Sequence, residues 1–379
     1  MTHSRPIRIL HCLCTIGSGG VEQRRALLAA NLPRDSFHHT VICQEAFGSV
    51  PGQLADAGWS VHEIGPARHI LNPVWYTRAI AIAKQVKPDI VHGAVFEGIA
   101  LANIIGLRFP TAKIISEETS DPVNRRWTGN FLIRWLYSCS NAVVGVSPSV
   151  IDYLRNTGHV PNQKLRLINN AVGDDIPPPK SMIDELRSNL GIRPGDIIIG
   201  TVGRLIDSHK RFSDILRAMP AVLSRHASAR LLIIGDGPDR AELMLLAEDL
   251  GISDAVIFAG YQGKVRDFYH LMDLFVLASA HEAFGLVLVE AMLAGVPIVA
   301  TAVGGIPFVL NNGECGKLTP PHQPEALAHA ISSLIADEGA RDRFRKAALS
   351  RARSEFSADR YCREVEELYR SLSQKTFAI

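Results

Sequence analysis

Short apolar runs recur along the chain, and a turn and then a helical pattern follow most of them. Continuous apolar runs of this kind are typical of strands that are buried on both faces of a parallel sheet. Helical patterns fall between the runs, for example at residues 21–31, 212–223 and 239–250. Strands that alternate with helices favour doubly wound α/β sheets. The runs predict strands at residues 7–13, 39–43, 89–92, 113–116, 142–146, 197–200, 230–234, 256–259, 274–278 and 297–301.

The alternation pauses at residues 169–180, where the sequence reads NNAVGDDIPPPK. Three consecutive prolines and two adjacent acids are typical of a linker. We therefore expect two doubly wound Rossmann-like domains, at residues 1–175 and 176–355, and a charged, helical C-terminal stretch without a further strand. Ligands of such sheets bind at the carboxyl ends of the strands, so a cleft between two facing sheets is the expected site.

The composition is that of an ordinary globular chain, with 379 residues, 47% hydrophobic residues and a net charge of +2. It excludes a mainly disordered protein, and without a basic stripe nucleic-acid binding finds no support. The charge is uneven, since residues 1–170 carry 17 basic and 11 acidic residues and the remainder carries 23 and 27. A basic first half suits an acidic substrate or an anionic membrane surface, and chance variation on a solvated surface explains it equally well.

Cysteine usage and the N-terminus bear on the compartment. The six cysteines show neither a C-x-x-C pair nor the spacing of metal ligands, which favours reduced thiols. The first apolar run is too short for a signal peptide and contains Arg8 and His11. No run of 18 uncharged apolar residues is present that would span a membrane. We expect a cytoplasmic protein.

A glycine-rich segment, GSGGVE at residues 17–22, lies between the first predicted strand and the first predicted helix. Glycines such as Gly19 and Gly20 let the backbone approach a phosphate closely, and the start of a helix supplies free N–H groups. The spacing is not that of the dinucleotide fingerprint. A tight turn between strand and helix explains the segment equally well.

Two further segments follow strands of the second half. Gly203, Arg204 and then Lys210 come after the strand at 197–200, and both cations can reach one diphosphate from the carboxyl end of a strand. They can also be ordinary solvated cations. The segment GDGP at residues 235–238 closes the next strand, and here a simple turn is the favoured interpretation.

The strongest signal is HEAFGLVLVEAM at residues 281–292. Glu282 lies in the loop after a strand, and Gly285 opens a helix, so that the N–H groups of Gly285, Leu286 and Val287 can face an anion. Glu290 lies on the same helical face as Leu286, one turn deeper, and a carboxylate among apolar neighbours needs a partner. Ribose hydroxyls would serve, and so would a partner inside the protein.

These motifs, in this order, resemble those of the retaining glycosyltransferases of family 4, which have the GT-B fold. The segment VGGIP at residues 303–307 follows at the expected distance, and the resemblance covers almost the whole chain. It implies an acceptor-binding first domain, a nucleotide-sugar-binding second domain, and a C-terminal helix at 356–379 that crosses back to the first domain. The donor site that it implies consists of Gly19, Gly20, Gly203, Arg204, Lys210, Glu282, Phe284, Gly285, Leu286, Val287 and Glu290.

In the reaction that the resemblance implies, Arg204 and Lys210 neutralise the leaving diphosphate, Glu290 binds the ribose, and Glu282 contacts the donor sugar. Fixed cations and a helix start stabilise a developing negative charge, a task that many enzymes give to a metal ion. The chain contains no D-x-D motif. We therefore expect transfer without a metal or other cofactor and with retention at the anomeric carbon.

The chain departs from the family pattern in the first domain. Glu118 stands where a donor-contacting histidine is usual, and His92, at the end of a predicted strand, is expected to take over part of that catalytic role. A histidine whose hydrogen bonds are satisfied within the protein is the alternative. In the second domain Phe308, in place of the usual acid, follows VGGIP.

The resemblance implies transfer of a hexose or N-acetylhexosamine from a nucleotide sugar, with UDP favoured, to a glycan or lipid-linked acceptor of cell-surface polysaccharide or lipopolysaccharide synthesis. A GT-B epimerase or phosphorylase and a non-catalytic nucleotide-sugar-binding protein are the alternatives. The basic and aromatic segment RRWTGNFLIRW at residues 125–135 touches anionic lipid in one interpretation. In the other, which is favoured, it is a core-facing helix with arginines in water.

Overall fold

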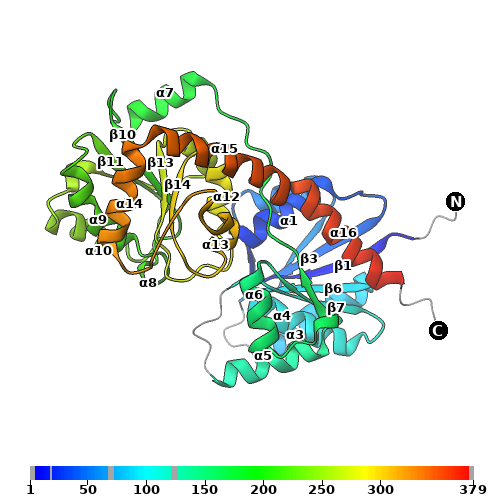
Figure 1. Ribbon diagram of the computed structural model, residues 1–379. Coiled ribbons are helices and arrows are strands. Elements are labelled where there is room, and N and C mark those ends of the chain that lie inside the picture. Colours follow the sequence, from blue (N-terminus) through cyan, green and yellow to red (C-terminus); the bar gives the residue numbers. More distant parts are fainter. Residues whose placement is uncertain (1–4, 18, 67–71, 121–126, 375–379) are drawn as a thin grey trace. The chain divides into compact units, whose positions relative to one another are not determined.

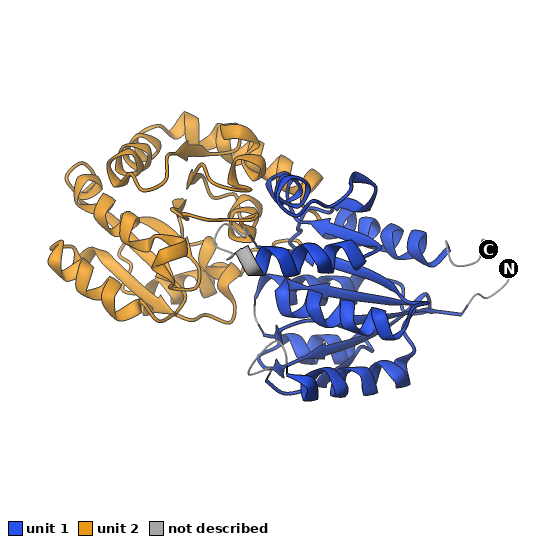
Figure 2. Cartoon of the chain, turned by 90° about the horizontal axis from the view of Figure 1, so that it is seen from below, with its two compact units in different colours: residues 1–172, 358–379 blue, residues 173–357 orange. Residues whose placement is uncertain are grey.

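The computed structural model describes residues 5–17, 19–66, 72–120 and 127–374. The chain divides into two compact units, which Figure 2 distinguishes by colour. Unit 1 comprises residues 1–172 and 358–379, and unit 2 comprises residues 173–357. The chain passes from unit 1 to unit 2 inside the segment expected to be a linker, and its C-terminal helix belongs to unit 1.

The described part of unit 1 contains a seven-stranded parallel sheet in the order β5-β3-β1-β6-β7-β8-β9 (Figure 1). Along β1, Ile9 faces one apolar core and Leu10 faces the other, because successive side chains of a strand point to opposite faces. Both faces of the sheet are therefore covered. The strands are β1 Ile7–Cys12, β3 Phe37–Cys43, β5 Ser60–Glu63, β6 Ile90–Ala94, β7 Lys113–Glu118, β8 Ala142–Gly145 and β9 Leu165–Leu167, beside a small pair, β2 Thr15–Ile16 and β4 Glu45–Ala46.

The C-terminal helix α16 closes one face of this sheet together with α1 and α2. Its buried residues, among them Val365, Tyr369 and Leu372, follow a helical period and pack into the same core as Leu28 of α1. Each large apolar side chain buried in this way stabilises the fold by about 1.5–3 kcal/mol. The helices of unit 1 are α1 Gly20–Asn31, α2 Val50–Asp56, α3 Pro73–Val86, α4 Val95–Arg108, α5 Trp127–Cys139, α6 Pro148–Asn156 and α16 Ala358–Gln374, with a 3₁₀ turn η1 Asn162–Lys164.

Unit 2 contains a six-stranded parallel sheet in the order β12-β11-β10-β13-β14-β15 (Figure 1). Its strands are β10 Ile197–Val202, β11 Ala229–Ile234, β12 Val256–Gly260, β13 Leu274–Leu277, β14 Ile298–Thr301 and β15 Lys317–Thr319. Its helices are α7 Lys180–Asn189, α8 Asp207–Lys210, α9 Phe212–Leu223, α10 Arg240–Asp249, α11 Val265–Tyr269, α12 Leu286–Leu293, α13 Ile306–Val309, α14 Pro324–Ala336 and α15 Glu338–Glu355, with 3₁₀ turns η2 Ser253–Ala255 and η3 Asn311–Gly313.

The predicted strands are all present, with ends that differ by a few residues. Three short strands at the edges of the sheets, β5, β9 and β15, and the small pair β2 and β4 are missing from the prediction. These strands have two to four residues, and most of their side chains are exposed or only partly buried, so they lack the continuous apolar run by which the central strands were found. No helix in the described part of the chain is long and apolar enough to cross a membrane.

Candidate functional site

The direction in which the sheet of unit 2 is wound determines where its ligand site is expected. The chain passes from β10 to β11 and β12 on one side, and then returns to β13 on the other side of β10. Such a reversal leaves a crevice beyond the carboxyl ends of the two strands that flank it, here β10 and β13. The segment after β10 carries Arg204 in its loop and Lys210 at the end of the short helix α8, and the loop after β13 carries Glu282. The topology therefore brings the three predicted charged residues to one edge.

Lys210 and Glu282 form an ion pair across this edge. The Nζ atom of Lys210 donates to Oε2 of Glu282 at 2.6 Å, and the hydroxyl of Ser279 lies 3.4 Å from the same oxygen. The side chains are 26% and 14% exposed, so both remain in contact with solvent. The N–H of Ala280 also donates to the carbonyl of His209, which ties the two loops together. The sequence suggests Lys210 and Glu282 as separate ligand-binding residues, and the structure shows them bonded to each other.

Arg204 is exposed, and no carboxylate of the described residues lies within ion-pair distance of its guanidinium. The backbone just before it is held by a close approach, because a Cβ atom on Gly235 would lie 1.9 Å from the carbonyl oxygen of Gly203. Gly235 also has φ +132°, which disfavours any other residue. The N–H of Leu205 donates to the carbonyl of Asp236. The GDGP segment therefore supports the loop that carries Arg204.

The start of α12 presents backbone donors at the same edge. Gly285 precedes the helix with φ +89° and ψ +63°, a left-handed conformation that glycine adopts without strain. No described residue accepts a hydrogen bond from the N–H groups of Leu286 and Val287. Because the N-terminus of a helix carries a partial positive charge, these groups suit an anion. The N–H of Gly305, in VGGIP, donates to the carbonyl of Glu282 and holds the preceding loop.

Glu290 lies one turn into α12 and is bound from within unit 2. The hydroxyl of Tyr269, a buried residue of α11, donates to Oε2 of Glu290 at 2.8 Å. Burial raises the pKa of the Glu290 carboxyl, and this hydrogen bond and the charge of Arg266 act in the opposite direction. Oε1 accepts no hydrogen bond from the described residues. The internal partner that the sequence allowed is present, and one carboxylate oxygen remains for a ligand hydroxyl.

In unit 1, Gly19 precedes α1, and Gly19 and Gly20 are both exposed. The helix that they open directs Arg24 and Arg25 into the interior, where their guanidinium groups lie 3.1 and 2.6 Å from the two oxygens of Glu117. The cations hold the pKa of the Glu117 carboxyl well below its usual range, against the effect of its burial. The helix that follows the glycine-rich turn is therefore held in place by the buried ion cluster of Arg24, Arg25 and Glu117.

His92 does not lie at the end of its strand. β6 continues for two residues to Ala94, and His92 is only 3% exposed. Its Nδ1 atom lies 2.8 Å from the hydroxyl of Tyr369 on α16, and its Nε2 atom lies 3.2 Å from Oε2 of Glu117. The expectation that His92 faces the ligand site is corrected, since α16 covers it and both ring nitrogens face polar groups of unit 1.

Glu118, which stands where the family pattern has a histidine, is fully buried as well. The hydroxyl of Tyr137 donates to Oε2 of Glu118 at 2.6 Å, and the hydroxyl of Ser120 donates to Oε1 at 2.6 Å. The carboxylate of Glu118 therefore connects Ser120, which follows β7, with Tyr137 of α5.

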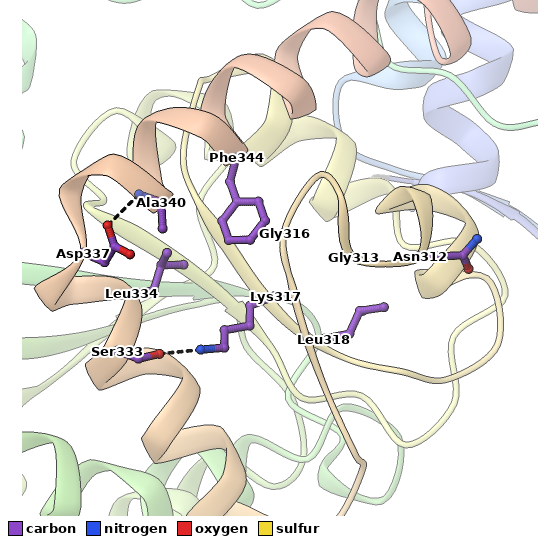
Figure 3. Close-up of a pocket in the computed structure, with 10 residues that line it drawn as sticks. All are labelled: Asn312, Gly313, Gly316, Lys317, Leu318, Ser333, Leu334, Asp337, Ala340 and Phe344. Carbon is purple, nitrogen blue, oxygen red and sulfur yellow. Dashed lines mark hydrogen bonds between the residues drawn. The ribbon is translucent and has the colours of Figure 1, made fainter.

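Two cavities lie elsewhere. One of about 430 Å³, shown in Figure 3, is lined by residues of β15, α14 and α15, including Lys317, whose Nζ donates to the hydroxyl of Ser333. The other, of about 780 Å³, lies in unit 1 beside the amino ends of β1 and β6, where Arg5 and Arg8 pair with Asp89. Neither cavity contains a predicted site residue. Among the described residues, no group of three or more histidines, cysteines or acids is placed to hold a metal ion.

Comparison with known protein families identifies the family to which the chain belongs. The family model described as "Glycosyl transferases group 1" matches residues 182–351, and that described as "Glycosyltransferase Family 4" matches residues 18–175. The chain belongs to the family 4 glycosyltransferases. The resemblance drawn from the sequence motifs is therefore confirmed.

Curated relatives of this glycosyltransferase chain act on different molecules. The N-acetyl-alpha-D-glucosaminyl L-malate synthase of Bacillus anthracis is 30% identical over 240 residues, which cover 63% of this chain and 62% of the relative. A D-inositol 3-phosphate glycosyltransferase of Rhodococcus erythropolis is 38% identical over 162 residues, which cover 40% of this chain and 36% of the relative. The chain thus spans less than two thirds of the length of these relatives.

Solved structures show the fold of the glycosyltransferase chain. HepE of Anabaena in complex with UDP-glucose aligns with a TM-score of 0.84 at 21% identity, over 96% of this chain and 100% of that one. WaaG, a glycosyltransferase involved in lipopolysaccharide biosynthesis, aligns with a TM-score of 0.71 at 17% identity, over 98% and 100%. The predicted fold class, two doubly wound Rossmann-like domains of the GT-B type, is confirmed.

Of the predicted site residues, those of unit 2 lie on the loops and the helix at the carboxyl edge of its sheet. Gly19 and Gly20 belong to unit 1, where they lie at the start of α1. Tyr269 is absent from the prediction, because nothing in the sequence around it distinguishes a core tyrosine from one that binds a carboxylate 21 residues away.

Proposed function

We propose that the chain is a retaining glycosyltransferase that moves a hexose or N-acetylhexosamine from a nucleoside-diphosphate sugar, preferably a UDP-sugar, to a glycan or lipid-linked acceptor. The single observation that carries the proposal is the carboxyl edge of the sheet of unit 2, whose loops and helices carry Arg204, the Lys210–Glu282 pair, Glu290 and the free N–H groups of α12. It combines donors for a diphosphate with carboxylates for hydroxyl groups, which is the chemistry of a nucleotide sugar.

In the proposed reaction the bond between the anomeric carbon and the diphosphate oxygen breaks, and the acceptor oxygen bonds to the same face of that carbon. The acceptor proton passes to the leaving phosphate oxygen. Negative charge grows on the diphosphate, and Arg204, Lys210 and the start of α12 stabilise it, because preorganised donors act most strongly where charge develops. Glu282, once Lys210 turns to the phosphate, accepts from sugar hydroxyls. We propose that these groups replace a metal ion and that no other cofactor takes part.

Glu290 binds the ribose in this proposal. Its free oxygen can accept from one hydroxyl group, and Tyr269 holds the other oxygen in place. The UDP preference is supported by the fold likeness to HepE, which was solved with UDP-glucose. A pathway of cell-surface polysaccharide or lipopolysaccharide synthesis and a cytoplasmic location, with peripheral contact to an anionic membrane, complete the proposal.

A thermal-shift screen with UDP, GDP, ADP and their sugar conjugates, in the presence of EDTA, tests the donor site. A ligand that binds only the folded state raises the melting temperature. We expect a selective rise with one nucleotide that Glu290→Ala abolishes, while Glu314→Ala, a change of an exposed carboxylate on another loop, leaves it intact. No rise with any nucleotide would contradict the proposal.

Product analysis with the donor so identified then tests the reaction. Transfer that depends on an added acceptor, with an unchanged anomeric configuration by NMR, is the expected result. A donor isomer formed without an acceptor would indicate an epimerase, phosphate-dependent cleavage would indicate a phosphorylase, and tight binding without turnover would indicate a binding protein.

A further inference from the structure

The helix α5 of unit 1 presents two faces of different character. Ile133, Leu136 and Tyr137 are buried in unit 1, as expected of a core-facing helix. On the opposite side Phe131 and Trp135, four residues apart and hence on one face, are 73% and 43% exposed. Single exposed aromatic residues are common, but two in register on one helix face form a patch. We call Phe131 and Trp135 the aromatic face of α5.

The part of the chain from α5 to β9 is basic. Residues 127–167 contain four arginines or lysines and one acid, Asp152, which pairs with Arg155. Nε of Arg134, on α5 itself, donates to the carbonyl of Thr157 at 2.7 Å, and Nζ of Lys164 donates to the carbonyl of Ser138, in the last turn of α5, at 2.7 Å. Neutral carbonyl groups fix these cations beside α5 without cancelling their charge.

We propose that the aromatic face of α5 is a docking surface for an anionic lipid bilayer. The rings of Phe131 and Trp135 enter the headgroup region, where aromatic side chains are favoured, and Arg134 and Lys164 meet the anionic headgroups. This inference rests on the membrane contact of the proposed function, which it assigns to a surface of unit 1, and it is independent of the proposed transfer reaction. Arg125 and Arg126, which the sequence suggested for lipid contact, lie outside the described residues, and the inference does not require them.

The size and charge of the patch favour a bilayer over a second copy of the chain. Two aromatic side chains bury about 300–500 Å² in total, whereas a stable protein interface buries about 800 Å² on each partner. Arg134 on α5 and Lys164 at its last turn carry the same sign, so two copies facing each other through this patch would repel. An anionic surface complements the same charges, each of which contributes about 1 kcal/mol near such a membrane.

Sedimentation of the full chain with lipid vesicles tests the surface, in the absence of any nucleotide sugar. We expect binding to vesicles of phosphatidylcholine with phosphatidylglycerol, weaker binding to phosphatidylcholine alone, and a loss of binding at high salt. The double variant Phe131→Gln/Trp135→Gln should lower the partition coefficient about tenfold or more, because it removes the inserted apolar area. The matched control Met244→Gln/Leu245→Gln changes two side chains of α10 in unit 2 that are 38% and 58% exposed, and should bind as the wild type does.

Three results would overturn the inference: no binding of the wild type to anionic vesicles, equal binding of the Phe131→Gln/Trp135→Gln variant, or a concentration-dependent dimer of the wild type that this variant abolishes. An unchanged melting temperature of the variant without ligand shows that it is folded. Insertion of Trp135 should give a blue shift of the fluorescence on vesicle addition that is missing in Trp135→Phe. Since no donor is present, a failure here leaves the proposed transferase function untouched, and the reverse also holds.

Discussion

The two units share one architecture and use their charged residues in opposite ways. Unit 1 buries Arg24, Arg25 and Glu117 almost completely, and its Glu117 side chain is 4% exposed. Unit 2 leaves Lys210 and Glu282 partly in solvent and Arg204 exposed. A buried ion cluster costs desolvation and is useful only when every member keeps its partner. A partly exposed pair contributes less to stability than a buried one, so each partner can exchange the other for a ligand.

The difference follows from what covers each polar group. In unit 1, α16 returns from the end of the chain and lies over His92 through Tyr369, 277 residues away. In unit 2, the polar groups lie on loops beyond the ends of β10 and β13, where no described helix of that unit buries Arg204. Polar residues of similar type are thus enclosed in unit 1 and remain accessible to solvent in unit 2.

Removal of the buried carboxylate should have the largest effect. Glu117→Gln leaves Arg24 and Arg25 charged and unpaired in the interior, which should lower the free energy of unfolding by about 3–5 kcal/mol in chemical denaturation. The control Asp152→Asn breaks an exposed pair with Arg155, and should change it by less than about 1 kcal/mol. Equal effects of the two variants would remove the contrast between buried and exposed pairs.

Removal of the Lys210 cation in unit 2 should have the opposite result, with a large loss of activity and a small loss of stability. Lys210→Ala should lower kcat about 10²–10³-fold, the effect of removing one donor to a developing anion. It should change the free energy of unfolding by less than about 1 kcal/mol. Lys346→Ala, on the exposed side of α15, is the control and should change neither. A large loss of stability with normal turnover in Lys210→Ala would show that the pair with Glu282 is structural.

Acid should destabilise unit 1 through its buried histidines. Burial and the charge of Arg25 lower the pKa of His39 to about 3, and burial likewise lowers the pKa of His11 well below its usual range. Because the unfolded state then binds protons first, stability is complete above about pH 6.5 and falls as the pH decreases. His39 should contribute a loss of about 2 kcal/mol between pH 7 and pH 5.

Unfolding free energies measured at pH 7 and pH 5 check this expectation. His39→Gln should reduce the difference between the two values, whereas His226→Gln, outside this cluster, should keep it. Glu117 titrates only below its ordinary pKa and does not enter this range. If His39→Gln showed the same difference between pH 7 and pH 5 as the wild type, protonation of His39 would not oppose folding, and the prediction would be wrong.

The smallest effect is expected for Tyr269→Phe, which removes the hydrogen bond to Glu290 without changing the shape of the side chain. A net loss of about 1 kcal/mol should weaken nucleotide binding by about tenfold or less. Because this bond lowers the pKa of Glu290, its loss should move the acid limb of the binding profile to higher pH. Tyr261→Phe, at an exposed tyrosine, should leave the limb in place.

The fold was largely predictable because its central strands carry continuous apolar runs. The run at 230–234 corresponds to β11 Ala229–Ile234, which is buried along most of its length. β9 Leu165–Leu167 was missed, since an edge strand with half-exposed residues gives no such run. For the candidate site, the positions of Glu282 and Glu290 around the start of α12 were predictable, because helical spacing is a local property.

The partners of polar groups were not predictable in the same way. The sequence suggested that His92 ends a strand, and the structure places it under α16. It suggested a core-facing helix at 125–135, with which the burial of Ile133, Leu136 and Tyr137 agrees, but it did not show that Phe131 and Trp135 of α5 are exposed. Both outcomes depend on which elements pack over the residue, and helical or strand periodicity contains no such information.

The sequence by itself determined the alternation of strands and helices, the glycine positions of the turns and the spacing of the motif at 281–292, because each depends on neighbours within a few residues. Only the tertiary structure decided that Lys210 pairs with Glu282, that Tyr269 holds Glu290, and that Glu117 lies between two arginines. These contacts join residues 21 to 93 positions apart. They form because a buried or half-buried charge must find a partner among whatever the fold brings near it.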